Sequence, residues 1–186
     1  KKFIYPISPN KIYPKFYHDL KKVLNTGKVG LFQLRLKRYS LKQKITIGEK
    51  IQPICKKYGV KFLVNDDPIL SKKINADGCH IGQKDMSIAE ARKIVGNKII
   101  GVTCHNSLNL AKAAIKRKAD YIAFGSFFST KTKKVKYKAT TKIIDKVKKL
   151  TKIPIVAIGG ININNYKKLL LNNANFLAIS GYVWNN

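Results

Sequence analysis

Short apolar runs alternate with amphipathic stretches along most of the chain. Eight apolar runs bounded by Gly, Asn or Asp predict buried strands, and they span residues 3–7, 29–36, 61–64, 78–81, 99–104, 121–128, 155–161 and 176–183. Residues 87–95, 107–118 and 140–150 carry apolar side chains at three- and four-residue spacing, with lysines elsewhere, which is typical of amphipathic helices. Strict alternation of strand and helix predicts a parallel sheet with right-handed crossovers.

Eight repeats favour a closed (β/α)₈ TIM barrel that occupies residues 1–186 as a single domain. An internal echo supports closure, because Asn75-Ala76-Asp77, Lys118-Ala119-Asp120 and Asn173-Ala174-Asn175 each stand directly before a strand. We expect these tripeptides to form helix-to-strand turns, which makes Asp77 and Asp120 structural. Only two residues follow Trp184. The eighth helix is therefore expected to be missing or truncated, with another element, a partner subunit or a missing tail covering strand eight.

The net charge of +29 would ordinarily suggest a nucleic-acid partner or another anionic surface. Only four of the 38 basic residues are arginine, however, and the 34 lysines are spread along the whole chain. This distribution favours lysines on solvated helix faces, and no specific nucleic acid is expected. A basic nucleic-acid-binding protein remains the alternative from another functional class. In either case the positive field would attract phosphorylated substrates.

The cysteines and the hydropathy indicate the compartment. Cys55, Cys79 and Cys104 form no C-x-x-C pair, so neither a zinc site nor a disulfide framework is suggested, and the pattern fits a reducing cytoplasm. No apolar run approaches the ~20 residues that span a bilayer, and the N-terminus lacks a signal-peptide core. We therefore expect a cytoplasmic protein without a membrane partner. Adjacent strand residues point to opposite faces, so Cys104 and His105 are not expected to form a catalytic thiol–imidazole pair.

Three of the nine acidic residues lie at the ends of two neighbouring apolar runs. Asp66 and Asp67 follow one run, and Asp85 follows the next. In a (β/α)₈ barrel the active site is built at the carboxyl ends of the strands, where carboxylates together with substrate phosphates suit Mg²⁺. The alternative is that Asp66 and Asp67 cap one helix and Asp85 starts another. Cations expected on the same rim favour Asp66 and Asp85 as metal ligands, with Asp67 as a helix cap or a partner of the ligands.

Other polar residues are expected on the same rim. Gln33, Arg35 and Lys37 alternate with apolar residues, so they share one side of their strand; inside a barrel they would require an anion, whereas on an exposed edge strand they would face water. Gly159-Gly160 follows a strand and frees backbone N–H groups for a phosphate. The lysine-rich connection 131–138 either covers a diphosphate or is a solvated run. The remaining candidates are Asn65, His80, Gln83, Thr103, His105, Ser126, Thr130, Thr132, Lys133, Ser180 and Gly181.

Seven motifs in order resemble the thiamine phosphate synthase family. They are Gln-Leu-Arg-x-Lys at 33–37, Asn-Asp at 65–66, Ala-Asp-Gly-x-His-x-Gly-Gln-x-Asp at 76–85, Gly-Val-Thr-x-His at 101–105, Ala-Asp-Tyr-x-x-x-Gly at 119–125, Thr-x-Thr-Lys at 130–133 and Ala-Ile-Gly-Gly-Ile at 157–161. The resemblance implies a (β/α)₈ barrel that couples an aminopyrimidine methyl diphosphate to a thiazole phosphate, giving thiamine phosphate and diphosphate. It also implies Mg²⁺ as cofactor and a homodimer. A thiazole tautomerase-like barrel and a noncatalytic phosphate-binding barrel are the alternatives within this fold.

The resemblance also implies a role for each site residue. The pyrimidine diphosphate would be held by Gln33, Arg35, Lys37, Asn65, Thr103 and Lys133, of which Arg35, Lys37, Thr103 and Lys133 are the candidate catalytic residues. Mg²⁺ would be bound by Asp66 and Asp85. The thiazole phosphate would be held by Thr130, Thr132, Gly160, Ser180 and Gly181, with Ser180 and Gly181 competing for one family position. Ser126 and Ser129 replace prolines of the family, which suggests a looser turn before Thr130.

Overall fold

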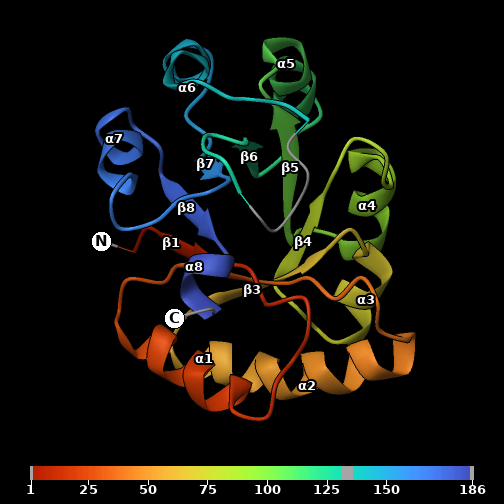
Figure 1. Ribbon diagram of the computed structural model, residues 1–186. Coiled ribbons are helices and arrows are strands. Elements are labelled where there is room, and N and C mark those ends of the chain that lie inside the picture. The colour runs from red at the N-terminus through yellow and green to blue at the C-terminus, as the bar shows by residue number, and fades with distance from the viewer. Residues whose placement is uncertain (1, 131–135, 185–186) are drawn as a thin grey trace.

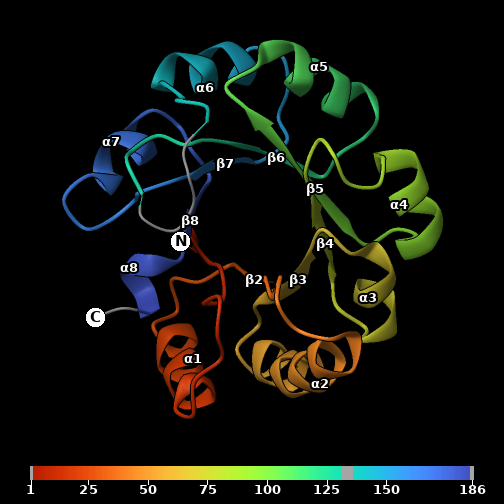
Figure 2. The same ribbon diagram turned by 45° about the vertical axis from the view of Figure 1, so that its right-hand side comes forward.

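A computed structural model describes residues 2–130 and 136–184. Parallel strands form a central ring, and helices surround it on the outside (Figures 1 and 2). The strands are β1 (Ile4–Pro6), β2 (Leu31–Leu34), β3 (Lys61–Asn65), β4 (Gly78–Ile81), β5 (Ile99–His105), β6 (Tyr121–Phe124), β7 (Ile155–Ile158) and β8 (Phe176–Ile179). The helices are α1 (Phe16–Asn25), α2 (Leu41–Lys57), α3 (Pro68–Lys73), α4 (Ile88–Val95), α5 (Leu108–Lys116), α6 (Thr141–Lys148), α7 (Tyr166–Leu171) and α8 (Gly181–Trp184).

The ring of strands is closed, as the alternating pattern predicts. Parallel pairing runs in the order β1-β8-β7-β6-β5-β4-β3-β2. The seam between β1 and β2 is held by the bridges Ile4–Val29 and Ile7–Gln33, and the Ser8 N–H donates to the Gln33 carbonyl at 2.8 Å. The (β/α)₈ barrel is therefore confirmed, and β2 is not an exposed edge strand.

An eighth helix is present, and within the described residues α8 is a single turn of four residues. Its Trp184 indole N–H donates to the Ile7 carbonyl at 2.6 Å. The Trp184 ring also contacts the rings of Phe16 and Phe32, with centroids 5.3 and 6.5 Å away. This one turn therefore ties the end of the described chain to β1 and to the apolar layer under α1.

Four strands end two or more residues earlier than the apolar runs predict, and β1 ends one residue earlier. The expected strands 29–36, 121–128, 155–161 and 176–183 were too long, since β2, β6, β7 and β8 end at 34, 124, 158 and 179. Apolar residues beyond these ends lie in loops or in α8 instead: Phe127 and Phe128, in the segment after β6, are partly buried and pack against the core. Gly159 and Gly160 have φ of 106° and 61°, which ends β7. An apolar run indicates that its residues are buried, but residues buried in a loop give the same pattern as residues of a strand.

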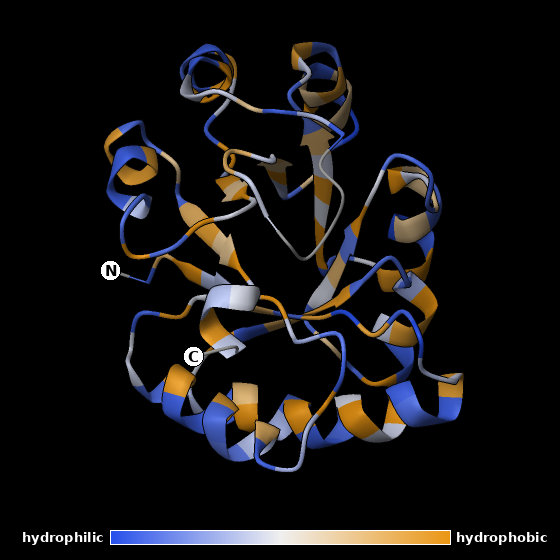
Figure 3. Ribbon diagram, viewed as in Figure 1, coloured by the Kyte–Doolittle hydropathy of each residue, from blue (hydrophilic) through white to orange (hydrophobic). Residues whose placement is uncertain are grey.

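The core has two apolar layers. Inside the ring lie the side chains of Tyr5, Ile7, Leu31, Leu63, Tyr121, Ala123, Val156 and Ala178. The second layer lies between the strands and the helices. The helices carry both hydrophobic and hydrophilic residues (Figure 3). Within the described residues, no helix is long and apolar enough to cross a membrane.

The three repeated tripeptides share one structure at the amino ends of the strands. Their first residues, Asn75, Lys118 and Asn173, have φ of 50°, 60° and 65°. Their third residues are Asp77, Asp120 and Asn175, and each accepts the backbone N–H of a neighbouring strand: Phe62 at 2.9 Å, Ile100 at 2.8 Å and Ile155 at 2.9 Å respectively. The predicted structural role of Asp77 and Asp120 is confirmed.

Candidate active site

Asp66 and Asp67 have different roles although they are adjacent. Asp66 has φ of 64°, a left-handed conformation that turns the chain out of β3. Asp67 is the N-cap of α3, and its carboxylate accepts the Leu70 N–H at 2.8 Å, with Pro68 in the first helical turn. Asp67 is thus the predicted helix cap, and the Asp66 carboxylate stays available on the rim.

Asp85 does not begin a helix, contrary to the alternative considered from the sequence. Its carboxylate accepts the Gly82 N–H at 2.7 Å and so closes the turn after β4. The N-cap of α4 is Ser87, which forms a reciprocal capping box with Glu90. Asp85 therefore also lies on the carboxyl rim, without a role in capping.

The carboxylates of Asp66 and Asp85 lie close enough to influence each other. Burial raises the pKa of Asp85, the Gly82 N–H opposes this, and the neighbouring Asp66 carboxylate raises the pKa of Asp85 further. Lys37 Nζ lies 3.3 Å from Asp66 Oδ2. Within residues 2–130 and 136–184, no three His, Cys, Asp or Glu side chains gather as a metal site. The rim thus offers a carboxylate pair beside a lysine, which suits a divalent cation whose shell a substrate phosphate completes.

The polar residues Gln33, Arg35 and Lys37 lie at different depths. Gln33 is 3% exposed and faces the barrel interior, where its Nε2 donates to the Tyr5 hydroxyl at 2.7 Å. Arg35 follows β2 and is half-buried; its guanidinium donates to Asn10 Oδ1 at 2.9 Å. Lys37 is exposed on the rim, in the ion pair with Asp66. The strand and its extension therefore present one amide inside the barrel and two cations above it.

His80 and Thr103 form the floor of the rim. His80 lies in β4, and its ring nitrogens Nδ1 and Nε2 are 2.7 Å from the Tyr121 hydroxyl and the Thr103 hydroxyl. Burial lowers the pKa of His80 to about 4, so the imidazole is neutral at physiological pH. Gln83 Nε2 donates to the Thr103 carbonyl at 2.6 Å. Asn65 is half-buried and is paired with His80 in the register of β3 and β4.

Tyr5 and Tyr121 belong to this floor, and the sequence reasoning missed them. Tyr5 and Tyr121 lie within the apolar runs 3–7 and 121–128, which predicted buried strands and no polar contact for either hydroxyl. A buried tyrosine hydroxyl nearly always finds a hydrogen-bond partner, and that rule could have marked them as members of a polar cluster.

The turns after β6, β7 and β8 form the other side of the rim. The Phe128 N–H donates to the Gly159 carbonyl at 3.0 Å, which brings the half-buried Thr130 segment beside the Gly159-Gly160 turn. A Cβ on Gly160 would overlap the Ser129 carbonyl, so the close approach requires glycine. Ser180 is half-buried, and its hydroxyl is 3.5 Å from the Ser8 carbonyl; Gly181 begins α8. Thr132 and Lys133 lie outside the described residues.

Tyr137, in the connection between β6 and α6, lies beside the segment that follows β6. The Ser126 N–H donates to the Tyr137 carbonyl at 2.9 Å, and the Ala139 N–H donates to the Ser126 carbonyl at 2.8 Å. The Tyr137 ring stacks on His105 with centroids 4.3 Å apart and planes 28° apart. His105 therefore holds the far end of this connection, on a strand that also carries Thr103.

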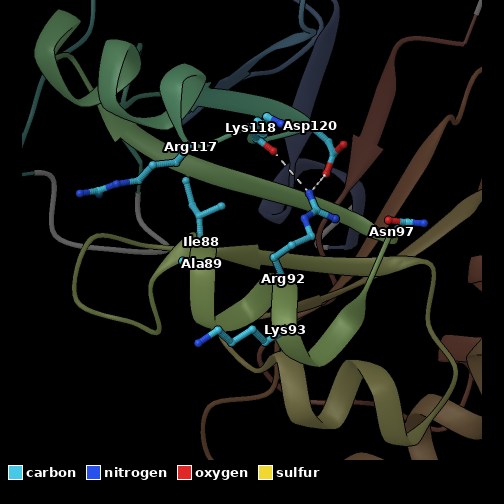
Figure 4. A pocket seen from close by; sticks show the side chains of 8 residues that line it. All are labelled: Ile88, Ala89, Arg92, Lys93, Asn97, Arg117, Lys118 and Asp120. Atoms are coloured by element: carbon cyan, nitrogen blue, oxygen red, sulfur yellow. Dashed lines mark hydrogen bonds and ion pairs between the residues drawn. The ribbon is translucent and has the colours of Figure 1, made fainter.

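A separate hollow of about 640 Å³ lies outside the barrel between α4 and α5 (Figure 4). Arg92 lines it and donates to the carbonyls of Gly96, Lys98 and Lys118 and to the Asp120 carboxylate, at 2.8, 2.5, 3.4 and 2.7 Å. These acceptors satisfy the hydrogen-bonding capacity of the Arg92 guanidinium. Arg92 therefore has a structural role here, connecting α4 to the neighbouring strands, and the hollow lies away from the carboxyl rim.

Comparisons with known proteins identify the family and agree with the fold. A family model described as thiamine monophosphate synthase matches residues 4–183. A thiamine-phosphate synthase of Pelagibacter ubique is 64% identical over 187 residues, covering 100% of this chain and 90% of that protein. The corresponding protein of Rhodospirillum centenum is 40% identical over 184 residues, covering 98% and 89%. The structure of a thiamine phosphate pyrophosphorylase from Pyrococcus furiosus superposes with a TM-score of 0.85 at 29% identity, covering 96% and 85%. The chain therefore belongs to the thiamine monophosphate synthase family.

Proposed function

We propose that the chain couples an aminopyrimidine methyl diphosphate to a thiazole phosphate, forming thiamine phosphate and releasing diphosphate. Family membership and the curated relatives named thiamine-phosphate synthase support this reaction. The single structural observation that carries it is the carboxylate pair, Asp66 and Asp85, beside Lys37 at the carboxyl ends of the strands.

We propose Mg²⁺ as the cofactor, held by Asp66 and Asp85. Burial raises the pKa of Asp85 most, and the neighbouring Asp66 carboxylate raises it further because the two carboxylates repel each other. A divalent cation bound by both would relieve this repulsion. Oxygen ligands from two carboxylates are the donor set that Mg²⁺ takes when substrate phosphates supply further ligands. When bound, the ion supplies positive charge to the departing diphosphate.

The protein side chains would then act by binding and by fixed charge. Arg35, Lys37 and Lys133 would face the diphosphate, where negative charge builds as the bond to the pyrimidine methylene carbon breaks. Gln33, Asn65 and Thr103 would hold the pyrimidine diphosphate from inside the barrel and from the rim. The turns of Thr130, Thr132, Gly160, Ser180 and Gly181 would hold the thiazole phosphate, so that the thiazole nitrogen lies against the electron-poor carbon.

No protein nucleophile is required by this scheme. Two cysteines stand beside polar residues of the site strands: Cys79 precedes His80, and Cys104 lies between Thr103 and His105. Both are fully buried, and burial raises the pKa of each to about 12. Both are therefore protonated core thiols at neutral pH. The alternatives of a tautomerase-like or a noncatalytic barrel would leave the carboxylate pair and the rim cations without a diphosphate to bind.

The test is diphosphate release by the purified full chain supplied with both phosphorylated precursors and Mg²⁺. Asp66→Asn and Asp85→Asn should each lower kcat by at least about a hundredfold, the scale of losing one preorganised charge contact in a transition state. Asp145→Asn, a change at an exposed residue of α6, is the matched control and should not alter kcat. Absence of diphosphate release from the unmutated protein would refute the reaction. Full activity of both site variants would refute the metal assignment.

A further inference from the structure

A chain of four hydrogen bonds crosses the barrel interior and ends at the rim. Gln33 Nε2 donates to the Tyr5 hydroxyl at 2.7 Å, and the Tyr5 and Tyr121 hydroxyls are 2.8 Å apart. The Tyr121 hydroxyl is 2.7 Å from His80 Nδ1, and His80 Nε2 is 2.7 Å from Thr103 Oγ1. The five residues come from β2, β1, β6, β4 and β5, so the chain of bonds connects five of the eight strands across the barrel interior.

The inner members of this chain are shielded from water. Tyr5 is 1%, Tyr121 and Gln33 are 3%, and His80 is 8% exposed. Among the described residues, the two tyrosine hydroxyls make no other hydrogen bond. Each hydroxyl has one hydrogen and each neutral imidazole has one N–H, so the direction of any one bond sets the direction of all the others.

Gln33 sets that direction. Its amide nitrogen faces Tyr5, and an amide nitrogen can only donate. The Tyr5 oxygen therefore accepts, and its own hydrogen goes to Tyr121. Tyr121 in turn donates to His80 Nδ1, which leaves the ring hydrogen on Nε2, directed at Thr103. Among the described residues, no carboxylate hydrogen-bonds the ring.

Ring packing holds these groups in place. The His80 ring stacks on Tyr121 with centroids 5.6 Å and planes 21° apart, and Tyr5 meets Tyr121 edge-on at 6.0 Å and 86°. Gly101 makes room for the Tyr121 ring, because a Cβ there would overlap it. The hydroxyl and imidazole groups thus sit on rings that have little freedom to turn away.

We propose that this chain fixes His80 as the Nε2–H tautomer and leaves the Thr103 hydroxyl hydrogen free to donate to an oxygen of a bound diphosphate. Thr103 is half-buried at the rim, where its hydroxyl accepts from His80 and has its hydrogen left for a ligand. Tyr5, Tyr121 and His80 are positioning residues that act through Thr103. The identity of the ligand rests on the proposed function, whereas the tautomer does not.

The direct test is the ¹⁵N NMR spectrum of the imidazoles in the full chain without ligand. The chain has three histidines, and His80→Gln identifies the signals of His80 by their loss. We expect the hydrogen on Nε2 and an unprotonated Nδ1. Tyr121→Phe removes the donor to Nδ1 and should shift the tautomer toward a mixture, whereas Tyr58→Phe, at a tyrosine outside the chain of bonds, should leave it unchanged. A hydrogen on Nδ1 in the unmutated protein would overturn the inference even if Tyr121→Phe fails to fold.

The second test measures the affinity for inorganic diphosphate in the presence of Mg²⁺. Thr103→Ser keeps the hydroxyl and should change the Kd by no more than about twofold, whereas Thr103→Val removes it and should raise the Kd about tenfold or more, as for a lost hydrogen bond to a charged group. Tyr121→Phe alone should also raise the Kd. When it is added to the Thr103→Val variant, it should raise the Kd by much less, because its effect acts through the Thr103 hydroxyl. Equal affinity of the Ser and Val variants would overturn the role of Thr103. The NMR result does not depend on turnover, so failure of the proposed reaction and failure of this inference are distinguishable.

Discussion

Asp120 offers the most direct test of how the turns at the amino ends of the strands stabilise the barrel. Its Oδ2 accepts the Ile100 N–H at 2.8 Å and forms an ion pair with Arg92 at 2.7 Å. Asn175, at the equivalent place in another repeat, makes the same two kinds of contact with an amide oxygen, to Ile155 N–H and Lys148. The comparison implies that the acceptor oxygen, and not the negative charge, is what the turn needs.

The contribution of each of these two contacts of Asp120 to the free energy of unfolding depends on how buried the contact is. Ile100 is fully buried, so Asp120→Ala leaves a backbone N–H without a partner, which costs about 1–3 kcal/mol. The ion pair is worth less than about 1 kcal/mol, because the side chains of Arg92 and Asp120 are 31% and 44% exposed and three carbonyls still accept from Arg92. We therefore expect Asp120→Ala to lower the free energy of unfolding by about 2–3 kcal/mol, and Asp120→Asn by less than about 1 kcal/mol.

Urea unfolding followed by the fluorescence of Trp184, the single tryptophan, measures both losses on one protein. At about 2–4 °C per kcal/mol for a chain of this size, Asp120→Ala should also lower the Tm by about 4–12 °C. Diphosphate release should be unchanged in folded protein, because Asp120 lies at the end of the barrel opposite the rim. Equal destabilisation by Asn and by Ala would refute the reasoning, since it would assign the stability to the charge.

Three further predictions rest on other contacts. Lys118 has φ of 60°, a left-handed conformation that Asn tolerates better than Lys, and the other two repeats have Asn at this position. Lys118→Asn should therefore raise the free energy of unfolding, measured in urea, by up to about 1 kcal/mol. An equal gain from Lys118→Ala would contradict this explanation. Gly101→Ala places a Cβ against the Tyr121 ring and should cost about 1–3 kcal/mol of stability and weaken diphosphate binding; an unchanged Tm would show that the ring is not confined. Burial raises the pKa of Cys79 and of Cys104 to about 12 and raises that of Cys55, so the three thiols stay protonated at pH 8. They should react with an aromatic disulfide reagent only as the protein unfolds, and rapid labelling of the native protein would contradict their burial.

Local signals in the sequence predicted the elements that depend on neighbouring residues. The strand at 78–81, the helix that begins after Ser87 and the cap at Asp67 were all predicted because periodicity and capping act over a few residues. The repeated tripeptides were predicted as turns, and the structure adds that their third residues bond to the neighbouring strand.

The strand ends near 34, 124, 158 and 179 could not be predicted in the same way. Apolar residues after them are buried by loops and by α8, and a hydropathy pattern does not distinguish these kinds of burial. The roles of Thr132 and Lys133 stay predictions from the resemblance, outside the described residues.

The sequence by itself determined the order of strands and helices, the family and the list of polar residues at the strand ends, since all of these are properties of short segments. The sequence also predicted that Asp66 and Asp85 lie on one rim with cations, and the structure adds the ion pair between Asp66 and Lys37. Only the tertiary structure decided that Tyr5 meets Tyr121, 116 residues away. Those contacts arise because a closed ring brings strands from both ends of the chain together, and the hydrogen-bond capacity of each buried group then has to be met by whichever groups the ring places beside it.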